Sequence, residues 1–253
     1  MRANRRTSPS SVLAVALASI LAAAVLVAGC SKDRPPAEGA TTISVQGHDV
    51  AAIERKPAKA SSDEPTVLFL HGQAYSSRIW DDRGILDAVT AAGDRAVAVD
   101  LPGHGDTPDR PELTGDDADA AVARGVWLRD LIDELGGPER VVVVSPSMSG
   151  SYSLQYLSQF ATERLAGFVP VAPVGIDGFR RPDEGAIVPA VAIWGSKDPS
   201  YSPERAQHLV DQLKGGSSRD RTEVIEGASH AAYDDHPEEF TALLTAFLAS
   251  LDR

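Results

Sequence analysis

Cysteine is nearly absent from this sequence of 253 residues, which has only one, Cys30. A single cysteine cannot close a disulfide within the chain, so a packed apolar core has to hold the fold. Basic residues are also few: the chain has 24 lysines and arginines, 36 aspartates and glutamates, and a net charge of −12. This balance argues against nucleic acid as a partner. We find no internal repeat and no metal-ligand spacing, so we expect neither a metal nor an organic cofactor.

Residues 1–29 have the layout of a secretory signal. Three arginines among the first six residues precede a nearly continuous run of alanine, valine and leucine at residues 12–28, and Cys30 follows. A run of about 17 residues lies at the lower limit for crossing a bilayer, so a retained transmembrane anchor is the alternative. The segment resembles bacterial lipoprotein signals, and this resemblance implies that Cys30 is lipidated and becomes the new N-terminus.

Lipidation at Cys30 would make residues 30–40, which are rich in proline, glycine and charge, a tether. We therefore expect an exported protein, lipid-anchored to the outer face of the bacterial cell membrane or to the periplasmic face of a membrane, because several acyl chains together anchor stably. Residues 41–253 are enough for one domain with one core. Without residues 1–29 the chain has 21 basic and 36 acidic residues, a net charge of −15.

Apolar runs and turn residues predict the order of the elements. Residues 41–46 and 50–55 alternate apolar and polar side chains on either side of turn residues 47–49, which predicts a β-hairpin. Short continuous apolar runs are typical of strands buried on both faces of a parallel sheet. They occupy residues 66–70, 96–99, 141–144, 167–171 and 190–194, and a last strand is expected near 222–225. Helical spacing is found at residues 79–92, 116–135, 150–160, 203–213 and 237–251.

This alternation of strands and helices predicts an α/β fold. We expect a doubly wound, mostly parallel sheet with an N-terminal antiparallel hairpin. Ligands of such sheets bind beyond the carboxyl ends of the strands. The residues that follow the predicted strands are therefore the candidates for a site, and serine, aspartate and histidine all occur among them.

The stretch VVVVSPSMSG, residues 141–150, takes a predicted strand into a cluster of small residues. A serine hydroxyl needs a base to become a nucleophile, and a strand-to-helix turn with small residues two positions before and after the serine presents it to that base. Ser147 has this position, with serine instead of glycine at both flanking sites. We interpret Ser147 as the candidate nucleophile, and Ser145 and Ser149 as packing residues whose hydroxyls bond locally.

An acid and a histidine follow Ser147 at later strand ends. Asp198 comes after the strand predicted at residues 190–194, and His230 comes after the last predicted strand. This order of nucleophile, acid and base is the one found in α/β hydrolases. The three residues predict a catalytic triad, in which His230 takes the proton of Ser147 and Asp198 orients His230.

Other residues compete for these roles. Asp177 follows the strand at residues 167–171 and is the alternative acid. Asp100 precedes the nucleophile and reads as part of a structural turn, and His236 lies at the start of a predicted helix. We expect His71 to shape the loop after the first parallel strand, and His208 to lie on a helix surface.

Attack on an acyl carbon places negative charge on the acyl oxygen, which needs preorganised donors. The backbone N–H of Met148, directly after the nucleophile, and that of Gln73, after the first parallel strand, are the expected oxyanion donors. The Gln73 side chain and Tyr75 either border an acyl pocket or belong to an ordinary surface loop.

Five motifs carry a resemblance to a known family. The chain is similar to the α/β-hydrolase domain-containing protein fourteen family in the motifs VLFLHG, RAVAVDLPG, SPSMSG, GFVPVAP and DP, which begin at residues 67, 95, 145, 167 and 198. More broadly, it resembles the α/β-hydrolase superfamily over residues 41–251. The resemblance implies Ser147 as nucleophile, Asp198 as acid and His230 as base.

The family is associated with hydrolysis of small activated acyl esters and, in an animal member, with transfer of acetyl groups from lysine to coenzyme A. We do not expect coenzyme A as the acceptor here, because the signal segment points outside the cytoplasm. The chain departs from the family in this leader and in GFRR at residues 178–181.

The connection at residues 175–188 is where α/β hydrolases insert a lid. Its 14 residues are too few for a helical cap domain, so we expect a minimal lid and an open site that suits small or protruding acyl groups. Arg180 and Arg181 in this connection either meet an anionic substrate or form a solvated pair of charges, and we favour the solvated pair.

The sequence therefore predicts a membrane-tethered serine hydrolase that cleaves small-molecule acyl esters. One alternative is an acyltransferase or deacetylase that passes the acyl group to an acceptor other than water. Another is a non-catalytic surface lipoprotein that uses the fold to bind a partner. The second alternative is disfavoured because a binding module does not need serine, aspartate and histidine at three separate strand ends.

Overall fold

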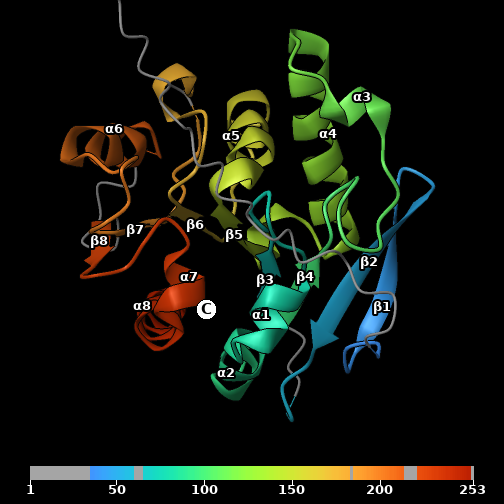
Figure 1. The fold of residues 1–253 in the computed structure, drawn as a ribbon. Helices are drawn as coiled ribbons and strands as arrows, with labels where there is room; N and C mark the ends of the chain where they lie inside the picture. The colour runs from blue at the N-terminus through green and yellow to red at the C-terminus, as the bar shows by residue number, and fades with distance from the viewer. Residues whose placement is uncertain (1–34, 60–64, 183–184, 214–220, 252–253) are drawn as a thin grey trace, which may run out of the picture. The chain divides into compact units, whose positions relative to one another are not determined.

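The computed structural model describes residues 35–59, 65–182, 185–213 and 221–251. Within these ranges eight strands form one sheet, and helices pack on both of its faces (Figure 1). The strands are β1 Ala40–Val45, β2 His48–Arg55, β3 Thr66–Phe69, β4 Arg95–Val99, β5 Val141–Pro146, β6 Gly167–Val171, β7 Val191–Gly195 and β8 Arg221–Ile225. The α-helices are α1 Arg78–Asp82, α2 Ile85–Ala91, α3 Pro111–Thr114, α4 Ala118–Glu134, α5 Gly150–Gln159, α6 Pro203–Leu213, α7 Ala232–Asp235 and α8 Pro237–Ser250, and the 3-10 helices are η1 Pro138–Arg140, η2 Ser147–Ser149 and η3 Ile176–Gly178.

The predicted signal segment and Cys30 lie outside the described residues. Among the residues that are described, no helix has the length and apolarity needed to cross a membrane.

The sheet is mostly parallel, with an antiparallel N-terminal edge, as predicted. Its strand order is β1-β2-β4-β3-β5-β6-β7-β8, and only the β1–β2 and β2–β4 pairs are antiparallel. The hairpin turn is one residue shorter than predicted, since Gln46 and Gly47 have φ of 55° and 76° and His48 already pairs with Val45. Two residues with positive φ give a turn whose twist matches that of the strands it joins.

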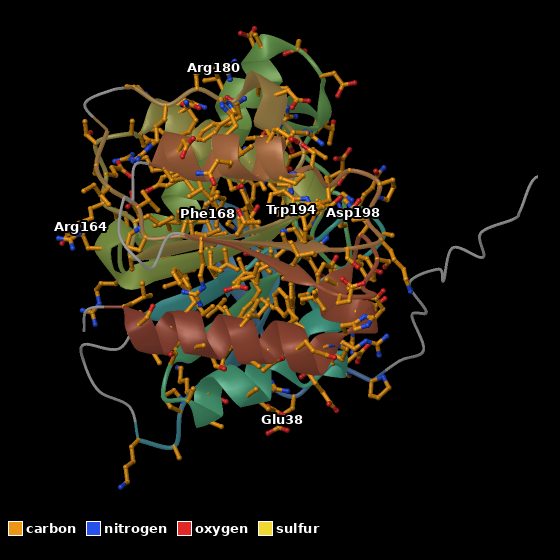
Figure 2. All side chains as sticks on the ribbon, turned by 90° about the vertical axis from the view of Figure 1, so that its left-hand side faces the viewer. Glu38, Arg164, Phe168, Arg180, Trp194 and Asp198 are labelled. Atoms are coloured by element: carbon orange, nitrogen blue, oxygen red, sulfur yellow. The ribbon has the colours of Figure 1, made fainter. Side chains whose placement is uncertain are left out.

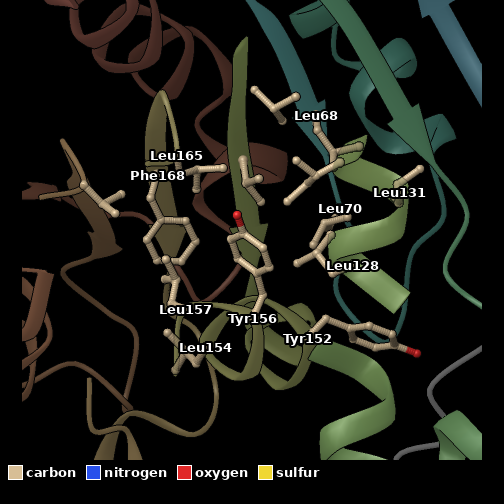
Figure 3. Packing of buried hydrophobic residues seen from close by; sticks show 14 of the residues in the cluster. Leu68, Leu70, Leu128, Leu131, Tyr152, Leu154, Tyr156, Leu157, Leu165 and Phe168 are labelled. Carbon is tan, nitrogen blue, oxygen red and sulfur yellow. The ribbon is translucent and has the colours of Figure 1, made fainter. Parts of the chain in front are cut away.

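The four valines of β5 show why a parallel strand is a continuous apolar run. Successive side chains of a strand point to opposite faces, so Val141 and Val143 join one core cluster and Val142 and Val144 join the other. All four are at most 1% exposed. Figure 3 shows part of the first cluster, in which strand residues pack against α4 and α5; its members include Leu68, Leu70, Phe168, Leu128, Leu131, Leu154, Tyr156 and Leu157.

Helices α4, α5 and α6 cover the face of the first cluster, and α1, α2 and α8 cover the opposite face (Figure 1). The helix predicted at residues 79–92 is two helices, because Gly84 between them has φ of 69° and lies outside the helical region. The other four predicted helices are present with ends within two residues of the prediction. Helices α3 and α7 were not predicted, since four residues are too few to show helical spacing.

The connection between β6 and β7 contains, in its described part, the single short helix η3, which agrees with a minimal lid. Within it the prediction of a solvated arginine pair is wrong for Arg181, which is only 6% exposed. Arg181 Nη2 donates to the backbone oxygen of Ala161 at 2.8 Å, and burial lowers the pKa of the guanidinium. Arg180 is exposed, as expected. Arg181 is therefore a structural residue of the connection.

His71 holds the loop that follows β3. Its ring is fully buried, and its Nε2 accepts the backbone N–H of Leu101 at 2.9 Å. Because Nε2 is the acceptor, the proton is on Nδ1, which donates to the backbone oxygen of Gly72 at 2.8 Å. His71 thus joins the loops after β3 and β4, in agreement with the shaping role predicted for it.

Asp100 holds a second turn at the same edge of the sheet. Its carboxylate accepts the backbone N–H groups of Ser77 and Asp106 at 2.7 and 2.8 Å, as expected of a structural turn. Figure 2 shows the two ends of the parallel strands: Arg164 lies before β6 at the amino ends, and Asp198 lies after β7 at the carboxyl ends. The loops that bear the candidate site therefore lie together at the carboxyl ends of the strands.

Burial lowers the pKa of His71 to about 4, whereas a histidine in the unfolded chain has a pKa of about 6.5. Between these values the unfolded state binds a proton that the folded state does not, so stability falls as the pH falls from about 6.5 to about 4. The shift corresponds to about 3 kcal/mol over this window. His71→Gln keeps an acceptor but does not titrate, so the free energy of unfolding in urea should depend less on pH in this variant.

The matched control is His48→Gln at the exposed end of β2, which shows what removal of a surface histidine does to the same measurement. Equal pH dependence in the wild type and His71→Gln would contradict the assignment of a buried neutral imidazole.

Candidate active site

Ser147 lies at the turn between β5 and α5 and has φ of 48°, in the left-handed region that residues other than glycine rarely adopt. Its backbone oxygen accepts the N–H of Val174 at 2.9 Å, which ties the turn to the segment after β6. An added Cβ at Gly150 would lie 2.5 Å from the oxygen of Val174 and 2.8 Å from Cβ of Pro173. The turn can pack here only because residue 150 has no side chain.

The serines that flank Ser147 are fully buried and bonded locally, as predicted. Ser145 Oγ lies 3.0 Å from Ser149 Oγ and 2.7 Å from Ser153 Oγ, and Ser149 Oγ donates to the backbone oxygen of Pro146 at 2.7 Å. Buried hydroxyls are costly without partners. The three hydroxyls satisfy one another, which allows serine where the usual turn has glycine.

The structure brings Ser147, His230 and Asp198 together. His230 Nε2 lies 2.8 Å from Ser147 Oγ, and His230 Nδ1 lies 2.8 Å from Asp198 Oδ2. Because a carboxylate is an acceptor, Nδ1 carries the proton and Nε2 is free to accept the serine hydroxyl proton. The Asp198 side chain is 1% exposed, and its other oxygen accepts the backbone N–H of Ser200 at 2.8 Å. The arrangement can activate a serine hydroxyl as a nucleophile.

The position of His230 depends on close contact between its loop and β7. An added Cβ at Gly195, the last residue of β7, would lie 2.2 Å from the backbone oxygen of Ser229 and 2.3 Å from that of Ala228. The backbone N–H of Lys197 donates to Ala228 at 2.9 Å. The acid and histidine loops are therefore packed backbone against backbone.

The alternative residues have other partners. The Asp177 carboxylate accepts Arg205 Nε at 2.9 Å on the exposed surface, so it serves an ion pair. His236 directly precedes Pro237 at the start of α8, as expected. His208 lies on α6, where its Nε2 is 3.1 Å from Arg180 Nη1. The carboxylate that accepts the hydrogen bond from His230 Nδ1 is that of Asp198.

The loop after β3 lies against the nucleophile. An added Cβ at Gly72 would be 3.6 Å from Cβ of Ser147 and 3.2 Å from Oη of Tyr233. Gln73, the next residue, is exposed, and Met148 is half-buried next to Ser147. The two backbone N–H groups predicted as oxyanion donors therefore belong to residues that flank the same serine; their role in catalysis stays a prediction.

Sequence reasoning missed two residues of this site, Tyr233 and Asp234 in α7. Tyr75 Oη donates to Asp234 Oδ2 at 2.9 Å, so the hydroxyl of Tyr75 is engaged with α7. Their position three and four residues after His230 was visible in the sequence. Nothing in the sequence indicated that they meet a loop about 160 residues earlier.

The site is open to solvent, since the His230 side chain is 44% exposed. A hollow of about 310 Å³ lies beside the start of α5. Two of the residues that line it, Gly150 and Val174, also contact the turn at Ser147. Among the described residues, no group of three His, Cys, Asp or Glu side chains is placed to hold a metal ion.

Comparison with known proteins places the chain in a family. The model of the alpha/beta hydrolase family matches residues 67–192. ABHD14B of Rattus norvegicus, which is named as a proposed protein-lysine deacylase, is 37% identical over 215 residues, 83% of this chain and 95% of the rat protein.

Solved structures share the fold. A predicted CIB-like hydrolase from Thermoplasma acidophilum superposes with a TM-score of 0.68 at 23% identity, over 85% of this chain and 99% of that one. The esterase RhEst1 from Rhodococcus sp. ECU1013 superposes with a TM-score of 0.66 at 18% identity, over 85% of this chain and 100% of that one. With the family match and the identity to ABHD14B, these likenesses show that the chain belongs to the alpha/beta hydrolase family and is an ABHD14-like member of it.

Proposed function

We propose that this protein is a serine hydrolase of the carboxylesterase type that cleaves small acyl esters through an acyl-enzyme. The observation that carries the proposal is the position of His230, whose two ring nitrogens lie 2.8 Å from Ser147 Oγ and 2.8 Å from Asp198 Oδ2. A buried acid, an oriented imidazole and a serine on a strained turn are the parts that nucleophilic acyl transfer requires.

In the first half-reaction Ser147 Oγ attacks the acyl carbon while its proton moves to His230 Nε2. The imidazolium that forms is stabilised by the Asp198 carboxylate, which stays ionised. Negative charge builds on the acyl oxygen, and the N–H groups of Met148 and Gln73 are the proposed donors to it. His230 then gives its proton to the departing alcohol, which leaves the acyl group on Ser147.

In the second half-reaction His230 removes a proton from water, which attacks the acyl-enzyme and releases the acid. The exposure of His230 supports this step, since 44% of its side chain is in contact with solvent. An acyltransferase has to exclude water from the acyl-enzyme. In the described part of this chain, only a short connection lies over a site that is open to solvent. Water is therefore the proposed acceptor.

The size of the substrate is suggested by the hollow beside α5. Its volume of about 310 Å³ is at the low end of ligand sites, and Leu154, Val174 and Phe179 supply apolar surface around it. The described part of the connection above it has no helix besides η3. We infer that the hollow receives a short acyl or alcohol group.

A second candidate activity is removal of acyl groups from lysine side chains. It is favoured by the 37% identity to ABHD14B, which is named as a proposed protein-lysine deacylase. An open site admits a side chain that protrudes from a protein surface, and the same triad would attack the amide. Amides are less reactive than esters, so the ester activity is the first to test.

We also propose that the protein is exported and lipid-anchored at Cys30. The support is in the sequence: arginines, an apolar run at residues 12–28, and the segment VAGC that ends at the only cysteine. A diacylated or triacylated cysteine anchors a protein stably, whereas one acyl chain does not.

Ser147→Ala should abolish labelling by a fluorophosphonate probe and lower kcat for a short p-nitrophenyl ester at least 10⁴-fold, because the nucleophile is removed. Labelling is read by intact mass and by the modified peptide. The matched control is Ser250→Ala at the C-terminal end of α8, whose hydroxyl donates to the backbone oxygen of Phe247 at 2.7 Å. An unlabelled wild type with a cooperative unfolding transition would refute the proposal.

Activity should fall with acyl length in a panel of p-nitrophenyl esters from acetyl to dodecanoyl, because the hollow and the short connection enclose little apolar surface. We expect kcat/KM to be highest for two to four acyl carbons and about tenfold lower by eight. An Nε-acetyl-lysine peptide in the same panel tests the deacylase candidate by release of acetate. A maximum at dodecanoyl would mean that the acyl site is wrongly placed.

Expression with an alkyne-tagged fatty acid should label the full-length protein, and Cys30→Ser should remove the label. The labelled wild type should begin at residue 30, whereas Cys30→Ser should keep residues 1–29, and intact mass reads both. A retained transmembrane anchor predicts instead an unlabelled wild type that keeps residues 1–29, and that outcome would contradict lipidation at Cys30.

A further inference from the structure

Helix α7 begins two residues after His230 and packs against the loop after β3. Its Tyr233 is 1% exposed, and the ring lies 4.7 Å from that of Trp80 and 5.6 Å from that of Tyr75, measured between centroids. Trp80 Nε1 in turn donates to the backbone oxygen of Leu70 at 2.8 Å. An aromatic cluster therefore joins the segment of the proposed base to the segment of one proposed oxyanion donor.

The Tyr233 hydroxyl lies against the backbone of Gly72, and burial raises the pKa of this phenol. With Oη of Tyr233 3.2 Å from where a Cβ of residue 72 would lie, the contact leaves no comfortable room for a side chain there.

The carbonyl of Gly72 is held as well. It accepts His71 Nδ1 at 2.8 Å and the backbone N–H of Tyr75 at 3.0 Å. This carbonyl and the N–H of Gln73 belong to the same planar trans peptide, in which they point in opposite directions. Two donors that fix the carbonyl therefore also fix the direction of the Gln73 N–H.

A second contact runs through Asp234. Its Oδ2 accepts Tyr75 Oη at 2.9 Å, and its Oδ1 accepts Arg83 Nε at 2.7 Å. Burial, first, and the bond to Asp234 raise the pKa of Tyr75 to about 12, so the phenol keeps the proton that it donates. Asp234 thus bonds two residues that follow β3, Tyr75 and Arg83.

We propose that Tyr233 and Asp234 are positioning residues for the oxyanion donor: they clamp the loop at residues 72–75, which carries the Gln73 N–H, against the helix that follows His230. The proposal rests on the proposed function for its catalytic meaning. The clamp sets the Gln73 N–H relative to Ser147 from the same short segment that carries the base. Neither residue touches the substrate: Tyr233 packs against Gly72, and Asp234 acts through the side chain of Tyr75.

The clamp explains how side chains distant in sequence can orient a backbone donor. Backbone donors cannot be adjusted by changing their own side chains, so their aim depends on whatever holds the peptide plane. A preorganised donor is worth far more than a mobile one, because no free energy is spent on turning it during the reaction. Loosening the plane should weaken binding of the charged oxygen while leaving ground-state binding nearly unchanged.

The test compares Tyr233→Phe and Asp234→Ala with the wild type in the full chain, with Tyr156→Phe as the matched control. Tyr156 is also a buried tyrosine, 1% exposed, but its hydroxyl bonds to Glu163 in another part of the fold. For a short p-nitrophenyl ester we expect both α7 variants to lower kcat about tenfold to hundredfold, with KM within threefold of the wild type. The inhibition constant of a boronic acid, which mimics the charged intermediate, should rise by the same factor as kcat falls.

Hydrogen exchange of residues 71–77 supplies a readout that does not depend on turnover. Exchange there should be faster in Tyr233→Phe and Asp234→Ala than in the wild type and Tyr156→Phe. Loss of kcat without faster exchange or weaker boronate binding, or kcat within twofold of the wild type in both α7 variants, would overturn the clamp. An inactive, unlabelled wild type would refute the proposed function, and unchanged exchange in the α7 variants would then refute the clamp separately.

Discussion

The site depends on one strained backbone turn, at Ser147. A left-handed conformation of a residue other than glycine costs on the order of 1 kcal/mol or more and persists only when its surroundings leave no alternative. Here the Val174 N–H holds the carbonyl of Ser147, and Gly150 packs against the segment after β6 with no room for a side chain. Because the turn is held from the neighbouring strand, β6 has to end where it does for Ser147 Oγ to reach His230 Nε2 at 2.8 Å.

The buried serines show how such a turn can form without its usual glycines. Glycine at positions 145 and 149 would avoid steric conflict but would supply no hydroxyl to bond beneath the nucleophile. The hydroxyls of Ser145, Ser149 and Ser153 are small enough to fit and bond to one another beneath the nucleophile. Glycine is kept at Gly72, Gly150 and Gly195, where an added Cβ would lie within about 3 Å of another group. The chain thus uses glycine for backbone approach and serine for packing with a hydrogen bond.

Much of the fold could be predicted from the sequence because its signals are local. Each parallel strand is a continuous apolar run, and the candidate triad follows from which residues end those runs. Local signals failed where the deciding contact is distant in sequence. The sequence predicts a surface position for Arg181, and only the hydrogen bond from its guanidinium to Ala161 O shows that it is buried. Helix α7 is too short to show helical spacing in the sequence. Gly84 could have indicated the end of a helix, but the apolar spacing continues on both sides of it, so one helix was predicted where there are two.

The backbone sets the geometry of the reacting atoms in this site, so substrate specificity has to come from other groups. The proposed oxyanion donors are amides, the acid is buried, and His230 is bonded on both sides, so these groups constrain the reacting atoms without constraining the rest of the substrate. Groups that could select a substrate lie along the segment after β6, where Val174 and Phe179 line the hollow beside α5. That segment also holds the turn at Ser147 through the Val174 N–H. A change of residue there that alters the hollow without moving the backbone would change substrate preference while the nucleophile stays in place, whereas a change that moves the backbone would release the turn.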